Sequence, residues 1–258
     1  MENLKTEMQK NKVSVLGVSE VRWIGQGEIR SGDYTVYYSR GEWAERGVAV
    51  VMHKSIVRSV VKKIACNDRI FAIKLKAEPV NILIMQVYMR TLEYEDDEVE
   101  NLYDTTEEIL EEDGKGETNS IILGDWNSVV GEESYKNTVG SHGLSRRNHR
   151  GQMLIDFCER NGLIVNNIWF KKPKRRLCTW KAPGDWSRHQ LDYILVKHRF
   201  RNSVKEVQTL PGADIDSDHN LLVAKLRTRL KKIIRFRKSR PRWDWRSYML
   251  KDKECRIP

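Results

Sequence analysis

Short apolar runs separated by turn-forming residues dominate the hydrophobic pattern of this chain. Strands are predicted at residues 13–20, 34–39, 47–53, 55–64, 69–77, 80–89, 120–127, 163–167, 176–182, 190–196, 204–210 and 220–230. Helical spacing predicts helices at residues 1–10, 95–113 and 150–162. Two strand-rich halves with intervening helices indicate an α/β layered sandwich.

Polar residues border two apolar runs at positions where strands should begin or end. Asp218 and His219 open the run at 220–230, and Asp125 and Asn127 close the run at 120–127. Carboxylates, an amide and an imidazole at strand ends are typical of Mg²⁺-assisted phosphoester hydrolysis. The alternative for Asp125 and Asn127 is a turn in which both side chains bond the backbone.

Three further residues are candidate site residues because of their positions in or at the ends of predicted strands. Asp192 lies inside a core strand and needs a donor or an opposite charge, for which His219 is the natural candidate. Such a pair would fix the imidazole tautomer and favour its protonated form. Glu20 and Tyr88 each end an apolar strand, and alone they would be an ordinary surface acid and a packing residue.

Composition limits the class of protein. The chain has 258 residues with 40% hydrophobic content, enough for one substantial core. No apolar stretch approaches membrane-spanning length, and residues 1–12 lack the apolar centre of a signal peptide. The four cysteines have neither metal-finger nor redox spacing. We therefore expect a nuclear or cytoplasmic protein that is neither secreted nor membrane-bound.

The positive charge is concentrated at the C-terminal end. Residues 225–258 contain 14 Lys and Arg and 3 acidic residues, so the rest of the chain, with 32 basic and 33 acidic residues, is nearly neutral. We predict a domain at residues 1–228 and a basic aromatic tail at 229–258. The tail could bind a polyanion such as nucleic acid, with its aromatic residues stacking on bases, or it could be a solvated end whose aromatic residues pack on the domain. The aromatic residues are Phe236, Trp243, Trp245 and Tyr248.

Together these residues resemble a known superfamily. The segments are LGVSEVRW at 16–23, QVYMRT at 86–91, LGDWNS at 123–128, QLDYIL at 190–195 and SDHNLL at 217–222. In this order they resemble the endonuclease/exonuclease/phosphatase superfamily, with its DNase I-like and exonuclease III-like members. Residues 143–170, 179–196 and 211–232 look like craniofacial development protein 2-like sequences, which are similar to the endonuclease domains of RTE (BovB)-type non-LTR retrotransposons.

The resemblance implies a four-layer α-β-β-α sandwich and a DNA-nicking activity that depends on Mg²⁺ or Mn²⁺. It assigns metal binding to Glu20 and Asp218. Asp125 would activate the attacking water, and Asn127 would orient it. How the role of base divides between Asp125 and His219 stays open.

The same resemblance assigns the contacts with the substrate. Tyr88 and His219 would contact the scissile phosphate, and Asp192 would orient His219. Asn148 and Trp180 would contact the substrate DNA. The oligomeric state does not follow from the sequence.

One departure concerns the first strand of the family fold. Members begin with a strand that carries a Thr-Trp-Asn-like motif, whose Asn contributes to the site. Nothing similar precedes Glu20, so we expect a sandwich without this strand. Two other functions therefore stay open: a catalytically inactive domesticated relic that binds nucleic acid or protein, and hydrolysis of a small phosphoester such as an inositol phosphate or sphingomyelin.

Overall fold

The computed structural model describes residues 1–39 and 47–231 of the 258-residue chain. Its main α-helices are α1 (Glu2–Lys10), α3 (Asp96–Glu112) and α4 (His149–Arg160), and α2 (Lys54–Val57) is a single turn. Short 3₁₀ helices are η1 (Asn166–Trp169), η2 (Lys174–Arg176), η3 (Pro183–Asp185) and η4 (His198–Ser203). The strands form two larger sheets and three two-stranded pairs.

The six-stranded sheet has the order β10-β13-β9-β8-β6-β5. Its strands are β10 (Leu163–Val165), β13 (Asp192–Lys197), β9 (Asn119–Asp125), β8 (Ile82–Tyr88), β6 (Ile70–Leu75) and β5 (Val60–Ala65). The four-stranded sheet, in the order β1-β4-β3-β2, contains β1 (Val15–Ser19), β4 (Val48–His53), β3 (Tyr34–Ser39) and β2 (Gly27–Ser31). The pairs are β14 (Val204–Leu210) with β15 (Leu221–Leu226), β11 (Trp180–Lys181) with β12 (Arg188–His189), and β16 (Arg229–Leu230) with β7 (Ala77–Glu78).

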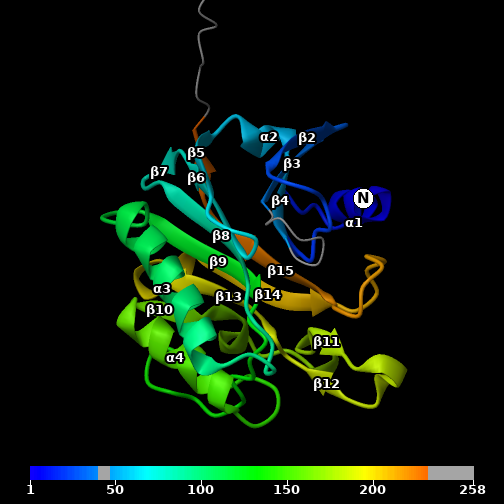
Figure 1. Cartoon of the computed structure of the whole chain (residues 1–258), viewed down its shortest axis with the longest axis vertical. Helices are drawn as coiled ribbons and strands as arrows, with labels where there is room; N and C mark the ends of the chain where they lie inside the picture. Colours follow the sequence, from blue (N-terminus) through cyan, green and yellow to red (C-terminus); the bar gives the residue numbers. More distant parts are fainter. Residues whose placement is uncertain (40–46, 232–258) are drawn as a thin grey trace, which may run out of the picture.

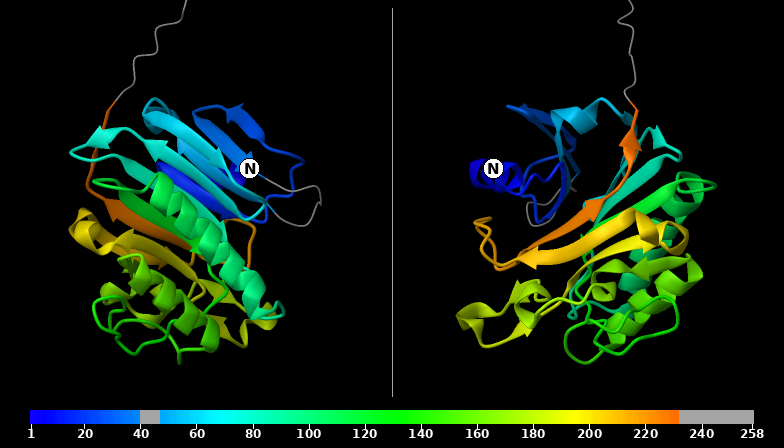
Figure 2. Two further views of the ribbon diagram at one scale, coloured as in Figure 1. Left: turned by 60° about the vertical axis from the view of Figure 1, so that its left-hand side comes forward. Right: turned by 180° about the vertical axis from the view of Figure 1, so that it is seen from behind.

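Three apolar clusters divide the molecule into four layers, as the sequence predicts. The first lies between the six-stranded sheet and helices α3 and α4, which cover one face of that sheet (Figure 1). The second lies between the six-stranded sheet and the layer made by the four-stranded sheet and the β14–β15 pair. The third packs Met8 of α1 against the outer face of β3 and β4. Figure 2 shows the resulting α-β-β-α order from two sides.

Strand register in the six-stranded sheet brings polar strand ends together. The parallel pairing of β8 and β9 places Tyr88 beside Asp125, and the antiparallel pairing of β9 and β13 places Asp192 beside Asp125 on its other side. Gly124 permits this close approach, because a Cβ there would lie 2.3 Å from the backbone oxygen of Val87. Three residues that are far apart in the sequence therefore form one row at the end of the sheet.

Some predicted elements differ from the observed ones. Residues 54–57 are a helical turn rather than the start of a strand, because the His53 side chain caps it by accepting the backbone N–H of Ser55. Of the strand predicted at 176–182, only Trp180–Lys181 is a strand. Strand β2 escaped prediction because it is short, polar and mostly exposed, with the sequence GEIRS.

The C-terminal part of the described chain stays attached to the domain. Arg229 and Leu230 pair with β7, and the backbone N–H of Lys231 donates to Lys76 O. The rest of the basic aromatic tail, residues 232–258, lies outside the described residues, so the predicted division at 228/229 remains a prediction. Within the ranges 1–39 and 47–231, no helix is both long and apolar enough to cross a membrane.

Candidate active site

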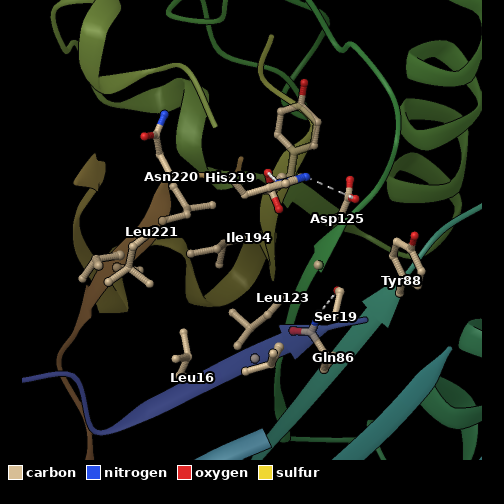
Figure 3. Close-up of a pocket in the computed structure, with 18 of the residues that line it drawn as sticks. Leu16, Ser19, Gln86, Tyr88, Leu123, Asp125, Ile194, His219, Asn220 and Leu221 are labelled. Carbon is tan, nitrogen blue, oxygen red and sulfur yellow. Dashed lines mark hydrogen bonds and ion pairs between the residues drawn. The ribbon is translucent and has the colours of Figure 1, made fainter. Parts of the chain in front are cut away.

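The candidate site lies at one end of a cavity of about 1670 Å³ between the two main sheets. All nine residues predicted from the sequence line this cavity. They are Glu20, Tyr88, Asp125, Asn127, Asn148, Trp180, Asp192, Asp218 and His219. Figure 3 shows His219 and Asp125 facing one another across the cavity, with Tyr88 beside Asp125.

His219 is held between carboxylates from two strands. Its Nδ1 lies 2.9 Å from Asp192 Oδ2, which is the contact that the buried position of Asp192 predicts. Its Nε2 lies 4.0 Å from Asp125 Oδ2. Burial lowers the pKa of His219, but the hydrogen bond and charge of Asp192 and the charges of Asp125 and Asp218 outweigh it and raise the pKa to about 9. His219 is therefore a cation at neutral pH.

Asp125 is the most deeply buried carboxylate of the site, with 8% of the residue exposed. Burial and the negative charge of Asp192 raise the pKa of Asp125, while the charge of His219 and the backbone N–H of Asn127 oppose them, with a net value of about 7. A carboxylate with this pKa is suited to accept a proton from water near neutral pH. The lower pKa of Asp125 thus makes it the proton acceptor, whereas the higher pKa of His219 keeps the imidazole a cation.

Asn127 is fixed against Asp125 by the turn that follows β9. Its backbone N–H donates to Asp125 Oδ1 at 3.0 Å, and its Nδ2 donates to Met89 O at 2.9 Å and Asp125 Oδ2 at 3.3 Å. Its φ of 46° lies in the left-handed region, where Asn is tolerated better than most residues. A turn formed by Asp125 and Asn127 therefore does not exclude a functional role for Asn127, because this turn holds the residue in the cavity.

Glu20 and Tyr88 form a second contact of the site. Tyr88 Oη donates to Glu20 Oε1 at 2.8 Å, and burial followed by this hydrogen bond raises the pKa of Tyr88 above its usual value. Glu20 has a φ of 57°, a conformation that costs a non-glycine residue free energy. The strained backbone directs this carboxylate toward Tyr88.

Asp218 is held by contacts with β11. Trp180 Nε1 donates to Asp218 Oδ2 at 2.6 Å, and the backbone N–H of Lys181 donates to Asp218 O at 3.2 Å. Trp180 also forms an isolated antiparallel bridge with His219. The β11–β12 hairpin therefore positions the loop that carries Asp218 and His219.

The donor chemistry of the cavity fits a hard divalent cation. Among the described residues no three His, Cys, Asp or Glu side chains converge as ligands. Mg²⁺ is commonly held by one or two carboxylates, with waters and phosphate oxygens completing its shell. Glu20 and Asp218, the two carboxylates predicted as metal ligands, line the same cavity, and their binding of a cation remains a prediction.

Asn148 has a structural role that was not predicted from the sequence. Its Oδ1 accepts the backbone N–H of Gly151 at 2.8 Å and that of Val129 at 3.0 Å, so it caps α4 and fixes the loop after Asn127. Its predicted contact with the substrate remains a prediction.

The residues that support Asp192 were not among those predicted from the sequence. Thr179 Oγ1 accepts the backbone N–H of Leu191 and of Asp192, and the Asn167 side chain bonds Asp192 O and the N–H of Ile194. Thr179 is 0% and Asn167 3% exposed. A polar side chain next to an apolar run indicates that a partner is needed when the side chain is buried, but it does not indicate which partner.

The sequence and the fold agree on the class of protein. Residues 1–219 match the model of the Endonuclease/Exonuclease/phosphatase family, and the chain belongs to this family.

Individual relatives are similar over most of the chain. Craniofacial development protein 2 from Bos taurus is 38% identical over 229 residues, which are 88% of this chain and 38% of that protein. The same protein from Tragulus javanicus is 38% identical over 88% of this chain and 40% of that protein. The chain thus spans about two fifths of the length of the curated relatives it matches.

Solved structures share the fold at low sequence identity. The endonuclease domain of TRAS1, a telomere-specific non-LTR retrotransposon, superposes with a TM-score of 0.63 at 14% identity and covers 88% of this chain and 91% of that one. A variant of the 3′ phosphatase NExo from Neisseria, bound to a product DNA hairpin, has a TM-score of 0.64 at 15% identity, with 88% and 93% covered. The Xenopus laevis APE2 catalytic domain has a TM-score of 0.63 at 14% identity, with 90% and 89% covered.

Proposed function

We propose that this chain is a divalent-metal-dependent phosphodiester hydrolase that nicks DNA, and that it derives from the endonuclease of a non-LTR retrotransposon. The observation that carries the proposal is the chain of contacts from Asp192 through His219 to Asp125 at the end of the cavity. The resemblance of residues 143–170, 179–196 and 211–232 to RTE-type endonuclease domains supports the origin. The TRAS1 endonuclease domain shares the fold.

In the proposed reaction, the Asp125 carboxylate takes a proton from a water molecule as its oxygen attacks phosphorus. Asn127, whose amide lies beside Asp125, orients that water. The P–O bond to the leaving oxygen breaks, and that oxygen takes up a proton from solvent, which gives a free hydroxyl on one end and a phosphate on the other.

His219 acts on the phosphate rather than on the water. Because its pKa is about 9, the imidazole is a cation that stabilises the negative charge developing on the phosphate oxygens. Asp192 keeps the ring protonated and oriented, and Tyr88 Oη would donate to a second phosphate oxygen once released from Glu20. A divalent cation held by Glu20 and Asp218 would neutralise phosphate charge.

The substrate class is tested by comparing DNA with small phosphoesters. With Mg²⁺ present, we expect conversion of supercoiled plasmid to nicked circles, no conversion in EDTA, and no turnover of inositol phosphates or sphingomyelin. Turnover of a small phosphoester without nicking would overturn the DNA assignment.

The competing function is a non-catalytic module that binds nucleic acid. The observation that favours it is that β1 and β15, which line the cavity beside the site, each pair with a single strand among the described residues. Salt-sensitive DNA binding without any nicking would support this function instead.

A further inference from the structure

Arg69 is a buried cation directly behind the candidate site. Only 4% of the residue is exposed, which is uncommon for arginine because burying a charge costs free energy unless the charge finds partners. β6 pairs with β8 so that Arg69 lies opposite Tyr88, whose backbone N–H donates to Arg69 O at 2.8 Å. The preceding turn fixes this position, because Asn67 Oδ1 accepts the backbone N–H groups of Arg69 and Ile70. The strand register therefore places a positive charge against Tyr88.

The guanidinium of Arg69 contacts Tyr88 in two ways. Its Nη1 donates to Tyr88 O at 3.2 Å, and its central carbon lies 5.0 Å from the centroid of the Tyr88 ring. The second distance is within the range in which a cation is attracted to the face of an aromatic ring. Tyr88 is thus held at its backbone and ring by Arg69 and at its hydroxyl by Glu20, which accepts the Oη–H at 2.8 Å.

The same cation connects Tyr88 with the loop that follows β8. The Arg69 guanidinium lies 5.8 Å from the ring centroid of Tyr94, and the Arg90 guanidinium lies 4.6 Å from the same centroid. Arg90 Nη1 in turn lies 3.3 Å from Glu98 Oε1 on α3. Aromatic rings and guanidinium groups therefore alternate from Tyr88 toward α3, and they hold a loop whose residues line the cavity.

The two supports of Tyr88 differ in what happens to them during the proposed reaction. Glu20 binds the divalent cation, and the Tyr88 hydroxyl leaves it for a phosphate oxygen. The contacts of Arg69 with the backbone and ring of Tyr88 do not involve the hydroxyl, so they persist when the hydroxyl changes its partner. Arg69 itself is buried outside the lining of the cavity, so it acts on a substrate only through Tyr88.

We propose that Arg69 is a positioning residue, which keeps the Tyr88 hydroxyl directed into the cavity when its bond to Glu20 is broken. This inference rests on the proposed function, because it concerns the step in which Tyr88 contacts the scissile phosphate. The positive charge also draws electron density from the ring and makes the hydroxyl a stronger hydrogen-bond donor. The loss of Arg69 should therefore affect nicking only while the Tyr88 hydroxyl is present.

A double-mutant cycle of nicking rates tests this dependence. Arg69→Met should lower kcat about tenfold and change KM for DNA by less than about twofold, since a contact made in the transition state is weakened. In the Tyr88→Phe background the same substitution should lower kcat by less than about twofold, because no hydroxyl remains to be directed. Arg199→Met is the matched control and should leave kcat unchanged. It removes an arginine that lies 5.4 Å from the Phe200 ring in η4, which follows the end of β13 remote from Asp192.

Arg69→Lys is the variant to use if Arg69→Met fails to fold. Its ammonium group keeps the buried charge, but it lacks the planar fork with which the guanidinium donates to Tyr88 O and stacks on the ring. We expect a loss in kcat of about threefold, which again disappears in the Tyr88→Phe background.

A measurement without hydrolysis tests the position of Tyr88 directly. Three-bond NMR couplings from the backbone to Cγ report the χ1 rotamer of each tyrosine in the metal-free protein. In Glu20→Ala, which removes the acceptor of the hydroxyl, we expect Tyr88 to keep one rotamer because Arg69 still holds the ring. In Glu20→Ala combined with Arg69→Met, we expect couplings averaged over several rotamers. Tyr193, which is fully buried and donates to Gln190 O, is the internal control and keeps one rotamer in both variants.

Three results would overturn this role of Arg69. An unchanged kcat in Arg69→Met would show that Tyr88 needs no such support. Equal losses of kcat with and without the Tyr88 hydroxyl would show that Arg69 acts on the stability of the fold alone. A single Tyr88 rotamer in Glu20→Ala combined with Arg69→Met would exclude orientation of the ring by Arg69. If the wild type does not nick DNA, the proposed function fails, and the couplings alone decide whether Arg69 orients Tyr88.

Discussion

His219 illustrates at the residue scale how the site depends on charges from separate segments. The carboxylates that raise its pKa are Asp192 on β13, Asp125 on β9 and the adjacent Asp218. Burial alone would have produced a neutral imidazole. The cationic state of this residue is therefore a product of the strand register that gathers the carboxylates.

Replacing Asp192 with Asn should lower the pKa of His219 from about 9, because the substitution removes the charged acceptor 2.9 Å from Nδ1 while burial still disfavours the cation. NMR titration of the imidazole in the metal-free protein measures this directly. Asp156→Asn, at an exposed position of α4, is the matched control. An unchanged His219 pKa in Asp192→Asn would show that this contact does not set the charge state.

Asp125, Asn127 and the Asp218–His219 pair could be predicted from the sequence because they are polar side chains at the ends of apolar runs. Asn148 and Trp180 were predicted from the family resemblance alone. The Asp192–His219 contact followed from the cost of burying Asp192 alone, and it is confirmed. The contact of Trp180 with Asp218 and the support of Asp192 by Thr179 could not be predicted. They depend on how the β11–β12 hairpin folds back, which no local pattern records.

At the scale of elements, helix α4 is coupled to the site through its first turn. Asn148 caps the helix and also holds the backbone of Val129, two residues after Asn127. A change at this cap therefore tests stability and the predicted substrate contact together.

Asn148→Ala should destabilise the protein by about 1–2 kcal/mol, because two backbone N–H groups lose their acceptor. Asn148→Asp keeps an acceptor oxygen and places a favourable charge at the helix N-terminus, so stability should be retained. Urea unfolding measures both effects.

The predicted contact of Asn148 with the substrate gives the Asp variant a second signature. A carboxylate near the DNA phosphates should weaken binding several-fold while stability is unchanged. Fluorescence anisotropy with a labelled duplex measures the affinity. Wild-type affinity in Asn148→Asp would leave Asn148 with the capping role alone.

Strands with strong apolar patterns were predictable as elements. Residues 34–39 and 204–210 form strands with the expected bounds, because alternation and flanking turns coincide there. β2 and the single turn of α2 were not predictable, since one is polar and exposed and the other depends on the cap at His53.

At the scale of the whole molecule, the distribution of charge separates the domain from the end of the chain. Residues 232–258 contain 10 basic and 3 acidic residues, whereas the part that precedes residue 225 is nearly neutral. If this segment binds DNA through phosphates, the affinity must fall steeply with salt.

Replacing residues 232–258 by a Gly/Ser segment of equal length should flatten the dependence of DNA affinity on salt. Each lost phosphate contact reduces the slope of log K against log salt concentration by about 0.9, so loss of several contacts lowers it by roughly 3 or more. Anisotropy titrations over a range of KCl concentrations measure the slope. An unchanged slope would place the DNA-binding surface on the domain.

A layered α/β sandwich was predictable because apolar runs and helical spacing alternate along the chain, and the family resemblance implied that it has four layers. The order of strands within the layers was not, since it depends on long-range pairings such as β8 with β9 and β13 with β9. Those pairings create the row of Tyr88, Asp125 and Asp192 on which the proposed chemistry rests.

The measurement that tests this chemistry most directly is the rate of nicking of supercoiled plasmid in Mg²⁺ by the wild type and by two variants. His219→Ala removes the cation beside the phosphate, and Asp125→Ala removes the proton acceptor. We expect nicking by the wild type and a loss of at least about 100-fold in each variant, with the fold retained by circular dichroism. Nicking at the wild-type rate by both variants would contradict the assignment of the site.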